Sequence, residues 1–232
     1  MKKFIVKKDF FEIFPNAHIA VIIAKNIDNT KNIEGQKLLN QGIDISEQYI
    51  DSFIWTDNKV IKYWREAFSK FKSKKGARCS IEALLKRVYN GNKINSINPL
   101  VDIYNYISLK YGVPCGGEDI NKIEGNMLLT KAMGDENFIT YGSDISEPPY
   151  PEEIVYKDDL GVICRCLNWR ECTRTLLDEQ TKEAILFIES IDETNLENIK
   201  NASLEMENLI KDKLKGKTIL KILNKENFEI EF

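Results

Sequence analysis

One helix in this sequence has both ends marked by the residues around it, which fixes where regular structure begins and stops. Asn98 can cap a helix, and Pro99 suits the first helical position. Gly112 is typical of the residue after a helix, and Pro114 prevents the helix from resuming. Between these ends, apolar residues recur at helical spacing at Leu100, Ile103, Tyr104, Ile107 and Tyr111. We predict a buried helix over residues 99–111.

The segments on either side of this helix predict a chain of mixed secondary structure. Helical spacing recurs over residues 60–71 and 80–88, with Ser80 as the expected cap. A late helix is expected between a capping Thr194 and Gly216. Short runs typical of strands lie at residues 4–6, 17–24, 127–130, 138–140, 153–156, 161–166, 183–191, 218–223 and 228–232. The last two are expected to form a closing hairpin. The pattern predicts one α/β (α+β) domain over residues 1–232, with helices packed on mixed sheets.

Composition excludes several classes of protein. The chain has 232 residues, 43% of them hydrophobic and 30% charged, which is typical of a globular domain. Its longest apolar run, Ile19–Ala24, is far too short to cross a membrane. The basic start of the chain lacks the apolar centre of a signal peptide. Five cysteines in a chain of this size are expected to be reduced thiols. We therefore expect a cytoplasmic protein with no membrane partner.

Charge is distributed unevenly along the chain. Residues 59–93, the basic segment, hold eleven basic residues against Glu66 and Glu82, a net charge of +9 in a chain whose total is −3. Such segregation suits a polyanionic partner, although a solvated helix face would show the same composition. The candidate contacts are Lys70, Lys72, Lys74, Lys75, Arg78, Lys86 and Arg87.

The sequence gives little support for a metal site or for catalysis by histidine. Cys164, Cys166 and Cys172 lie close together, but a closed zinc site needs four ligands, and C-x-C is not its usual spacing. The single histidine, His18, is far away in sequence and is read as a strand-end residue. We predict no metal and no cofactor.

Two further segments combine residues that suit ligand binding. Gly116 and Gly117 lie between a proline and two acids, a pattern typical of a tight loop that a ligand can approach closely, or of a plain turn. Residues 165–171 hold an amide, an indole and two guanidinium groups, which suit stacking on a base and gripping a phosphate or carboxylate. A core tryptophan beside a surface ion pair is the alternative.

Together these segments resemble a known family. The matching runs are residues 80–88, 96–110, 113–119, 156–165 and 168–171, including V-D-I-x-N-Y, G-G-x-D and N-W-R. They are similar to the B3/B4 domain of the phenylalanyl-tRNA synthetase beta subunit, and more closely to freestanding proteins built from that domain alone. The resemblance spans about residues 64–189 and implies a three-layer mixed-sheet fold. Residues 192–232 are expected to add the helix and hairpin.

The resemblance implies a function. In the synthetase this domain hydrolyses the ester of a mischarged amino acid on tRNA, and freestanding relatives look like trans-editing deacylases. We therefore expect tRNA as the partner, no DNA, and an aminoacyl-tRNA hydrolase rather than a synthetase. A non-catalytic RNA-binding module and an amino-acid-binding protein are the alternatives. The expected catalytic residues are Asn105 and the amides of Gly116 and Gly117. The expected substrate-binding residues are Tyr104, Glu118, Asp119, Arg165, Asn168, Trp169, Arg170 and Glu171.

Three positions depart from the family pattern. Gly116 stands where the synthetase domain carries a histidine, and Tyr104 replaces a small threonine. Leu167 stands where the freestanding group usually has a tryptophan. Because the freestanding group shares the glycine, the first departure indicates a different substrate rather than a dead site.

Overall fold

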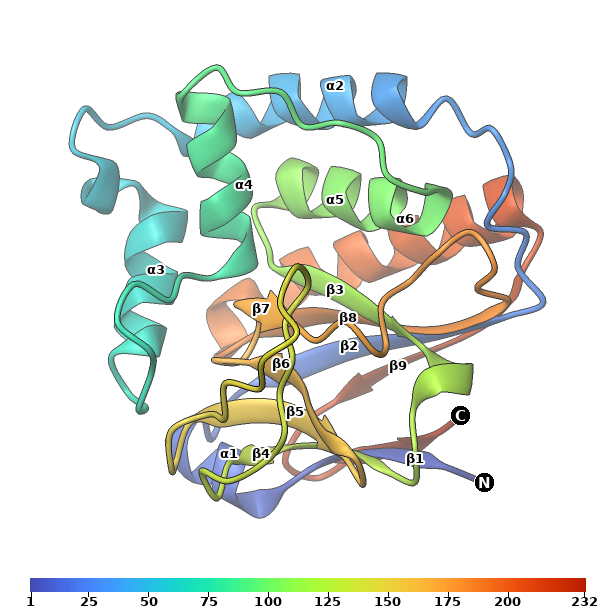
Figure 1. Cartoon of the computed structure of the whole chain (residues 1–232). Helices are drawn as coiled ribbons and strands as arrows, with labels where there is room; N and C mark the ends of the chain where they lie inside the picture. The colour runs from blue at the N-terminus through green and yellow to red at the C-terminus, as the bar shows by residue number, and fades with distance from the viewer.

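The computed structural model describes residues 1–232 and contains two β-sheets (Figure 1). The first sheet has the order β10 (Glu229–Glu231), β1 (Lys3–Val6), β4 (Met127–Lys131), β5 (Ile154–Asp158), β6 (Gly161–Arg165) and β7 (Arg170–Glu171). The second has the order β3 (Cys115–Asp119), β8 (Glu183–Ser190), β2 (His18–Lys25) and β9 (Lys217–Leu223). The first sheet is mixed, because β1 and β4 run parallel while its other pairs are antiparallel. The predicted α/β class is confirmed, although only the first sheet is mixed, because all pairs of the second sheet are antiparallel.

Helices form the remaining layer. α5 (Pro99–Tyr111) and α6 (Leu196–Leu214) pack on the four-stranded sheet, and α2 (Gly35–Ser46) packs on α5. α3 (Lys59–Phe68) and α4 (Ser80–Tyr89) lie at one end of the sheets, at the left of Figure 1, and the short α1 (Lys8–Ile13) packs on β4. Four 3₁₀ turns complete the fold: η1 (Glu47–Tyr49), η2 (Trp55–Asp57), η3 (Ile120–Lys122) and η4 (Glu193–Asn195). No helix is long and apolar enough to cross a membrane.

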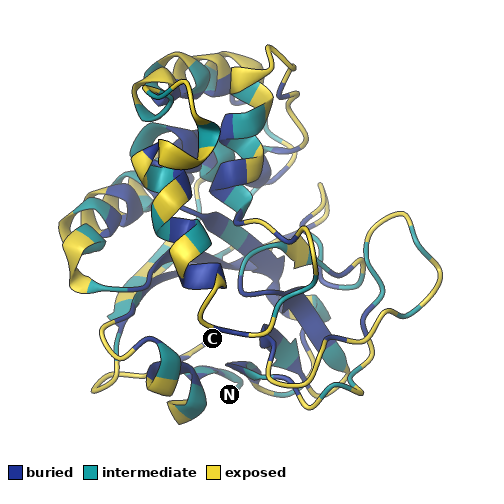
Figure 2. Cartoon of the chain, turned by 90° about the vertical axis from the view of Figure 1, so that its left-hand side faces the viewer, coloured by how far each residue is buried: buried dark blue, intermediate teal, exposed yellow.

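The four-stranded sheet is the central layer of the molecule. One apolar core lies between the two sheets, and a second lies between the central sheet and the helices. Along β8, Ile185 and Phe187 belong to the first core while Leu186 and Ile188 belong to the second. Burial on both faces explains why β2 is a continuous apolar run. Figure 2 shows strands in the middle of the molecule in dark blue, the colour of buried residues.

The helix with marked ends forms as predicted. The Asn98 side chain accepts a hydrogen bond from the Val101 amide at 3.1 Å, and Pro99 occupies the first turn. Gly112 has a φ of 64°, and a side chain there would also meet the Tyr49 ring at 2.9 Å. Both constraints require glycine where the helix ends.

Four local predictions are wrong. Residues 138–140 form only an isolated bridge from Thr140 to Cys172, because their carbonyl groups accept hydrogen bonds from two separate segments, Phe138 O from the Glu147 amide and Ile139 O from the Thr173 amide. β9 and β10 do not form a hairpin, because β9 pairs with β2 while β10 pairs with β1 in the other sheet. Ser80 is the first helical residue rather than the cap. Thr194 lies in η4, where the Asp192 side chain accepts a hydrogen bond from its amide at 2.9 Å, and α6 starts only at Leu196.

Candidate active site

A cavity of about 630 Å³ opens between the edge of the central sheet, the end of the first sheet and α4. Its walls come from α4, α5, β3, β8 and the segment from β6 to β7. On the antiparallel strands β3 and β8, Glu118 pairs in register with Ile185, and Gly116 with Phe187. Alternate residues of a strand share one face, so Gly116 and Glu118 face the layer between the sheets, as Glu189 of β8 also does. The fold thus brings carboxyl groups from two strands into one cavity.

Glu189 is the most strongly held carboxylate in the cavity. Its Oε1 accepts a hydrogen bond from the Tyr156 hydroxyl at 2.5 Å, and its Oε2 accepts one from the Asn168 side-chain amide. Only 3% of its surface is exposed, and this burial raises its pKa to about 7 although both hydrogen bonds act to lower it. A carboxyl group with this pKa can accept a proton at neutral pH.

Glu118 and Glu171 form a second acidic pair. Burial raises the pKa of Glu171 to about 7. Burial, followed by repulsion from Glu171, raises the pKa of Glu118 well above its ordinary value. The Glu118 Oε2 is buried and has no hydrogen-bond partner. Such an unsatisfied acceptor beside a second carboxyl group favours a cationic ligand.

The two glycines lie in strand β3, so the predicted tight loop is wrong. The Glu189 amide donates to Pro114 O at 3.4 Å, and the Asp119 amide donates away from β8, to Thr175 O at 2.9 Å. In an antiparallel pair, successive amides of one strand point alternately toward and away from the partner strand. The Gly116 amide therefore points at β8, while the Gly117 amide points at the edge of the sheet, where β3 has no neighbouring strand. The structure therefore leaves only the Gly117 amide available as an oxyanion donor.

Gly116 provides space rather than a hydrogen bond. A Cβ atom added there would meet a single neighbour, Oε1 of Glu171, at 3.4 Å. A larger side chain at this position would extend into the cavity beside that carboxyl group.

The mouth of the cavity is basic and aromatic. Arg87 of α4 and Arg170 of β7 are exposed there, and the Arg170 guanidinium lies over the Trp169 ring at 4.6 Å. Tyr104 and Asn105 on α5 are half-buried and line the wall. A polyanionic ligand is attracted at this entrance, whereas the interior is acidic.

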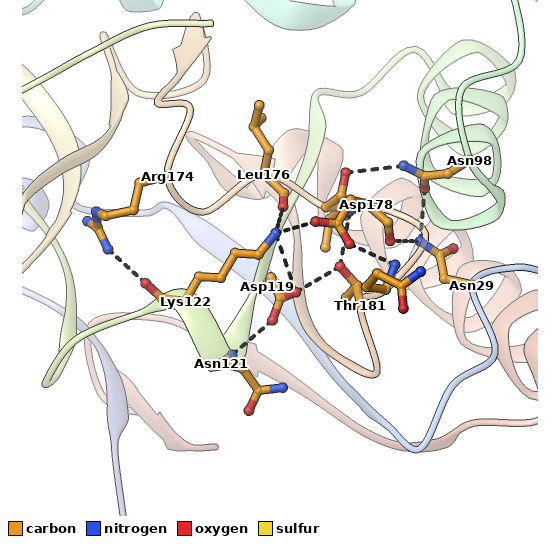
Figure 3. Close-up of polar contacts among 11 residues, drawn as sticks. Asn29, Asn98, Asp119, Asn121, Lys122, Arg174, Leu176, Asp178 and Thr181 are labelled. Atoms are coloured by element: carbon orange, nitrogen blue, oxygen red, sulfur yellow. Dashed lines mark hydrogen bonds and ion pairs between the residues drawn. The ribbon is translucent and has the colours of Figure 1, made fainter.

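Asp119, predicted to bind substrate, lies outside the cavity. Its side chain accepts hydrogen bonds from the Thr181 hydroxyl at 2.8 Å and the Asn121 amide at 2.9 Å, and Lys122 lies 3.8 Å away (Figure 3). Strand alternation explains this position, because Asp119 points to the opposite face from Glu118. Asp119 holds η3 and the loop before β8 together.

Arg165 was also predicted to bind substrate, but it is a structural residue. Only 2% of its surface is exposed, and it donates two hydrogen bonds to Glu153, at 2.9 and 2.8 Å. Its remaining nitrogen donates to Glu147 O at 2.9 Å. With one hydrogen bond from each of its three guanidinium nitrogens, Arg165 anchors the loop that precedes β5.

The predicted tRNA contacts fall into two groups, and of these residues only Arg87 lines the cavity. Lys70, Lys72, Lys74 and Lys75 lie on the loop after α3, and Arg78 follows them. Lys86 and Arg87 occupy the last turn of α4. Five of the seven are exposed, while Lys74 and Lys86 are half-buried. Lys74 forms an ion pair with Glu147 at 2.5 Å.

Sequence reasoning missed Glu189 and Tyr156. Glu189 follows the apolar residues of the predicted strand 183–191, and a carboxyl group next to such a run is a signal in itself. Tyr156 carries no such signal, because it resembles any core aromatic residue. The structure contains no cluster of three or more His, Cys, Asp or Glu side chains that could hold a metal ion, and all five cysteines are free and buried. His18 does not line the cavity.

Comparison with solved structures defines the fold. The chain is similar to an N-terminal fragment of the phenylalanyl-tRNA synthetase beta subunit from Pyrococcus horikoshii, with a TM-score of 0.51 and 13% identity. The likeness covers 98% of this chain and 53% of that fragment, so the chain spans about half of it.

Sequence comparison defines the family. The family model of the B3/4 domain matches residues 63–212, and the chain therefore belongs to the B3/4 domain family. A curated relative, the phenylalanine–tRNA ligase beta subunit of Leifsonia xyli subsp. xyli, is 33% identical over 70 residues. That stretch is 30% of this chain but only 8% of the ligase subunit.

Proposed function

We propose that the protein binds tRNA and hydrolyses the ester between a mischarged amino acid and the 3′-terminal ribose. The observation that carries this proposal is a buried carboxyl group, Glu189, whose pKa of about 7 suits a general base, in a cavity with a basic mouth. The names of the matched relatives, which are tRNA ligase subunits, support tRNA as the partner.

The reaction needs only groups that line the cavity. Glu189 accepts a proton from a water molecule, and the resulting hydroxide attacks the ester carbonyl carbon. The negative charge that develops on the carbonyl oxygen is stabilised by the Gly117 amide and the Asn105 side chain. The carbon–oxygen bond to the ribose then breaks, and the proton held by Glu189 passes to the leaving ribose oxygen. The products are a free amino acid and uncharged tRNA.

The acidic pair selects and positions the acyl group. The α-ammonium group of an aminoacyl ester is cationic, so Glu118 and Glu171 are its natural partners. Binding a cation between them stabilises their ionised forms and lowers both pKa values. An acyl group that lacks the amine, such as an N-acetylated amino acid, would leave the carboxyl groups unpaired and should be a poor substrate.

A deacylation screen tests this proposal. Purified protein is incubated with a panel of tRNAs, each charged with a different cognate or non-cognate amino acid, and release of the amino acid is followed over time. We expect accelerated hydrolysis of one class of mischarged tRNA and little effect on correctly charged ones. Hydrolysis at the buffer rate across the whole panel would reject the proposal and favour a module that only binds.

The loop after α3 should contribute charge to tRNA binding. Replacing Lys72, Lys74 and Lys75 together by glutamine removes three cations, so affinity for tRNA should fall about tenfold or more and depend less steeply on salt. The melting temperature should change little, because the only ion pair lost, Lys74 to Glu147, lies at the surface. Filter binding between 50 and 300 mM salt gives both quantities. An unchanged salt slope would show that these lysines do not contact phosphate.

A further inference from the structure

A second cavity, also of about 630 Å³, continues from the mouth of the first. The two share Ala83, Trp169 and Arg170, so they form one connected path over the surface. We call this second cavity the entry groove. Its functional groups come from η2, α3, the loop before α4, α4 and the segment around β7. They are Trp55, Arg65, Arg78, Lys86, Trp169 and Arg170.

The entry groove has an excess of positive charge. Its single carboxylate, Glu82, is 4% exposed and is already satisfied. Arg65 contacts it at 2.6 Å, Arg78 at 3.6 Å, and the Trp55 indole N–H donates to it at 3.2 Å. Lys86 and Arg170 remain to attract an anion.

The two remaining cations lie against aromatic rings. Lys86 Nζ is 4.4 Å from the centre of the Trp55 ring and 4.5 Å from that of Tyr89. The Arg170 guanidinium is 4.6 Å from the centre of the Trp169 ring. Both tryptophans are half-buried, which holds their rings in place while leaving part of each accessible. Each tryptophan therefore combines a partly accessible aromatic ring with a cation that lies over it.

This combination distinguishes unpaired from paired nucleic acid. An unpaired nucleotide can stack its base on an aromatic ring and place its phosphate near a neighbouring cation. A duplex keeps its bases stacked inside and presents only its backbone, so the tryptophans would contribute nothing to binding it. The paired arrangement of Trp55 with Lys86 and of Trp169 with Arg170 fits the first ligand and not the second.

We propose that the entry groove binds the unpaired nucleotides that precede the 3′-terminal residue of an RNA, with Trp55 and Trp169 as stacking surfaces. The inference rests on the proposed function, because the terminal residue is placed in the cavity that the groove joins. It assigns Trp55 a role in ligand binding, and it makes the ligand at this surface a single strand rather than a helix backbone.

Binding of short RNAs tests the groove directly. Fluorescence anisotropy would compare a labelled tetranucleotide that ends in CCA with a blunt RNA duplex of matched charge. Trp55→Ala should weaken tetranucleotide binding about tenfold, the effect of losing one stacked base, and leave duplex binding unchanged. Trp55→Phe keeps an aromatic face but loses the hydrogen bond to Glu82, so it should retain most of the affinity.

Two substitutions that change the charge equally test the groove without altering Trp55, so the result does not depend on whether Trp55→Ala folds. Lys86→Glu should weaken tetranucleotide binding, whereas Lys213→Glu, on the exposed face of α6, should not. Wild-type affinity in both Trp55→Ala and Lys86→Glu would overturn the inference, as would an equal loss of tetranucleotide and duplex binding in Trp55→Ala.

The same samples separate this inference from the proposed function. Wild-type protein is also assayed for hydrolysis of a mischarged tRNA. Groove-dependent binding of the tetranucleotide without any hydrolysis would support the groove and count against the deacylase. Hydrolysis without tetranucleotide binding would support the deacylase and count against the groove.

Discussion

Replacing Glu189 by glutamine is expected to lower the single-turnover rate of ester hydrolysis by about 100- to 1000-fold, the usual contribution of a general base. Glutamine has nearly the same shape but cannot accept a proton from water. Affinity for uncharged tRNA should be unchanged, because Glu189 is buried in the cavity and bonds to Tyr156 and Asn168 rather than to any of the predicted phosphate contacts. Rapid-quench kinetics with saturating enzyme would measure the chemical step alone.

A matched control is available on α6, which packs on the other face of the central sheet. Glu197→Gln makes the same chemical change at an exposed position on α6, and it should hydrolyse the ester at the wild-type rate. If Glu189→Gln also kept the wild-type rate, Glu189 would not be the base, and the role would pass to Glu171.

The second large effect is expected from Gly116→Trp. A Cβ atom at this position has only the Glu171 carboxyl group near it, so the indole ring would extend into the cavity and occupy the place of the acyl group. Hydrolysis should fall by at least about 100-fold, while uncharged tRNA still binds through the basic segment. Gel-shift and deacylation assays on one preparation would measure both.

Gly116→Ala is the graded control for this substitution. Its methyl group would make an ordinary contact at 3.4 Å with Oε1 of Glu171 and leave most of the cavity open. We expect activity within a few-fold of wild type. Equal activity of the alanine and tryptophan variants would mean that the acyl group binds elsewhere.

The sequence predicted elements whose determinants are local. The helix over residues 99–111 was predicted to the residue, because its cap, its proline and its terminal glycine act within a few positions of the chain. The two C-terminal strands were recognised as strands but wrongly paired. Their partners, β2 and β1, lie about 200 residues earlier, and no local signal specifies them.

The sequence likewise predicted the site residues that belong to local motifs, but not those that distant strand pairing brings together. Motif resemblance identified Glu118 and Asn168, and the structure places both at the cavity. It also included Asp119 and Arg165, which satisfy their hydrogen bonds elsewhere. A strand turns alternate residues to opposite faces, so adjacent motif positions such as Glu118 and Asp119 need not share a role. Glu189 enters the site only because β8 pairs with β3.

The most direct test of the account is the pH dependence of the single-turnover hydrolysis rate, after subtraction of the rate in buffer alone. Glu189 acts as a base only when it is ionised, so the rate should rise with pH, with a midpoint at about 7, and then become constant. Tyr156→Phe removes a hydrogen bond that lowers this pKa, so its midpoint should move to higher pH. A rate that rises without levelling, or a midpoint that Tyr156→Phe does not move, would contradict the assignment of Glu189 as the base.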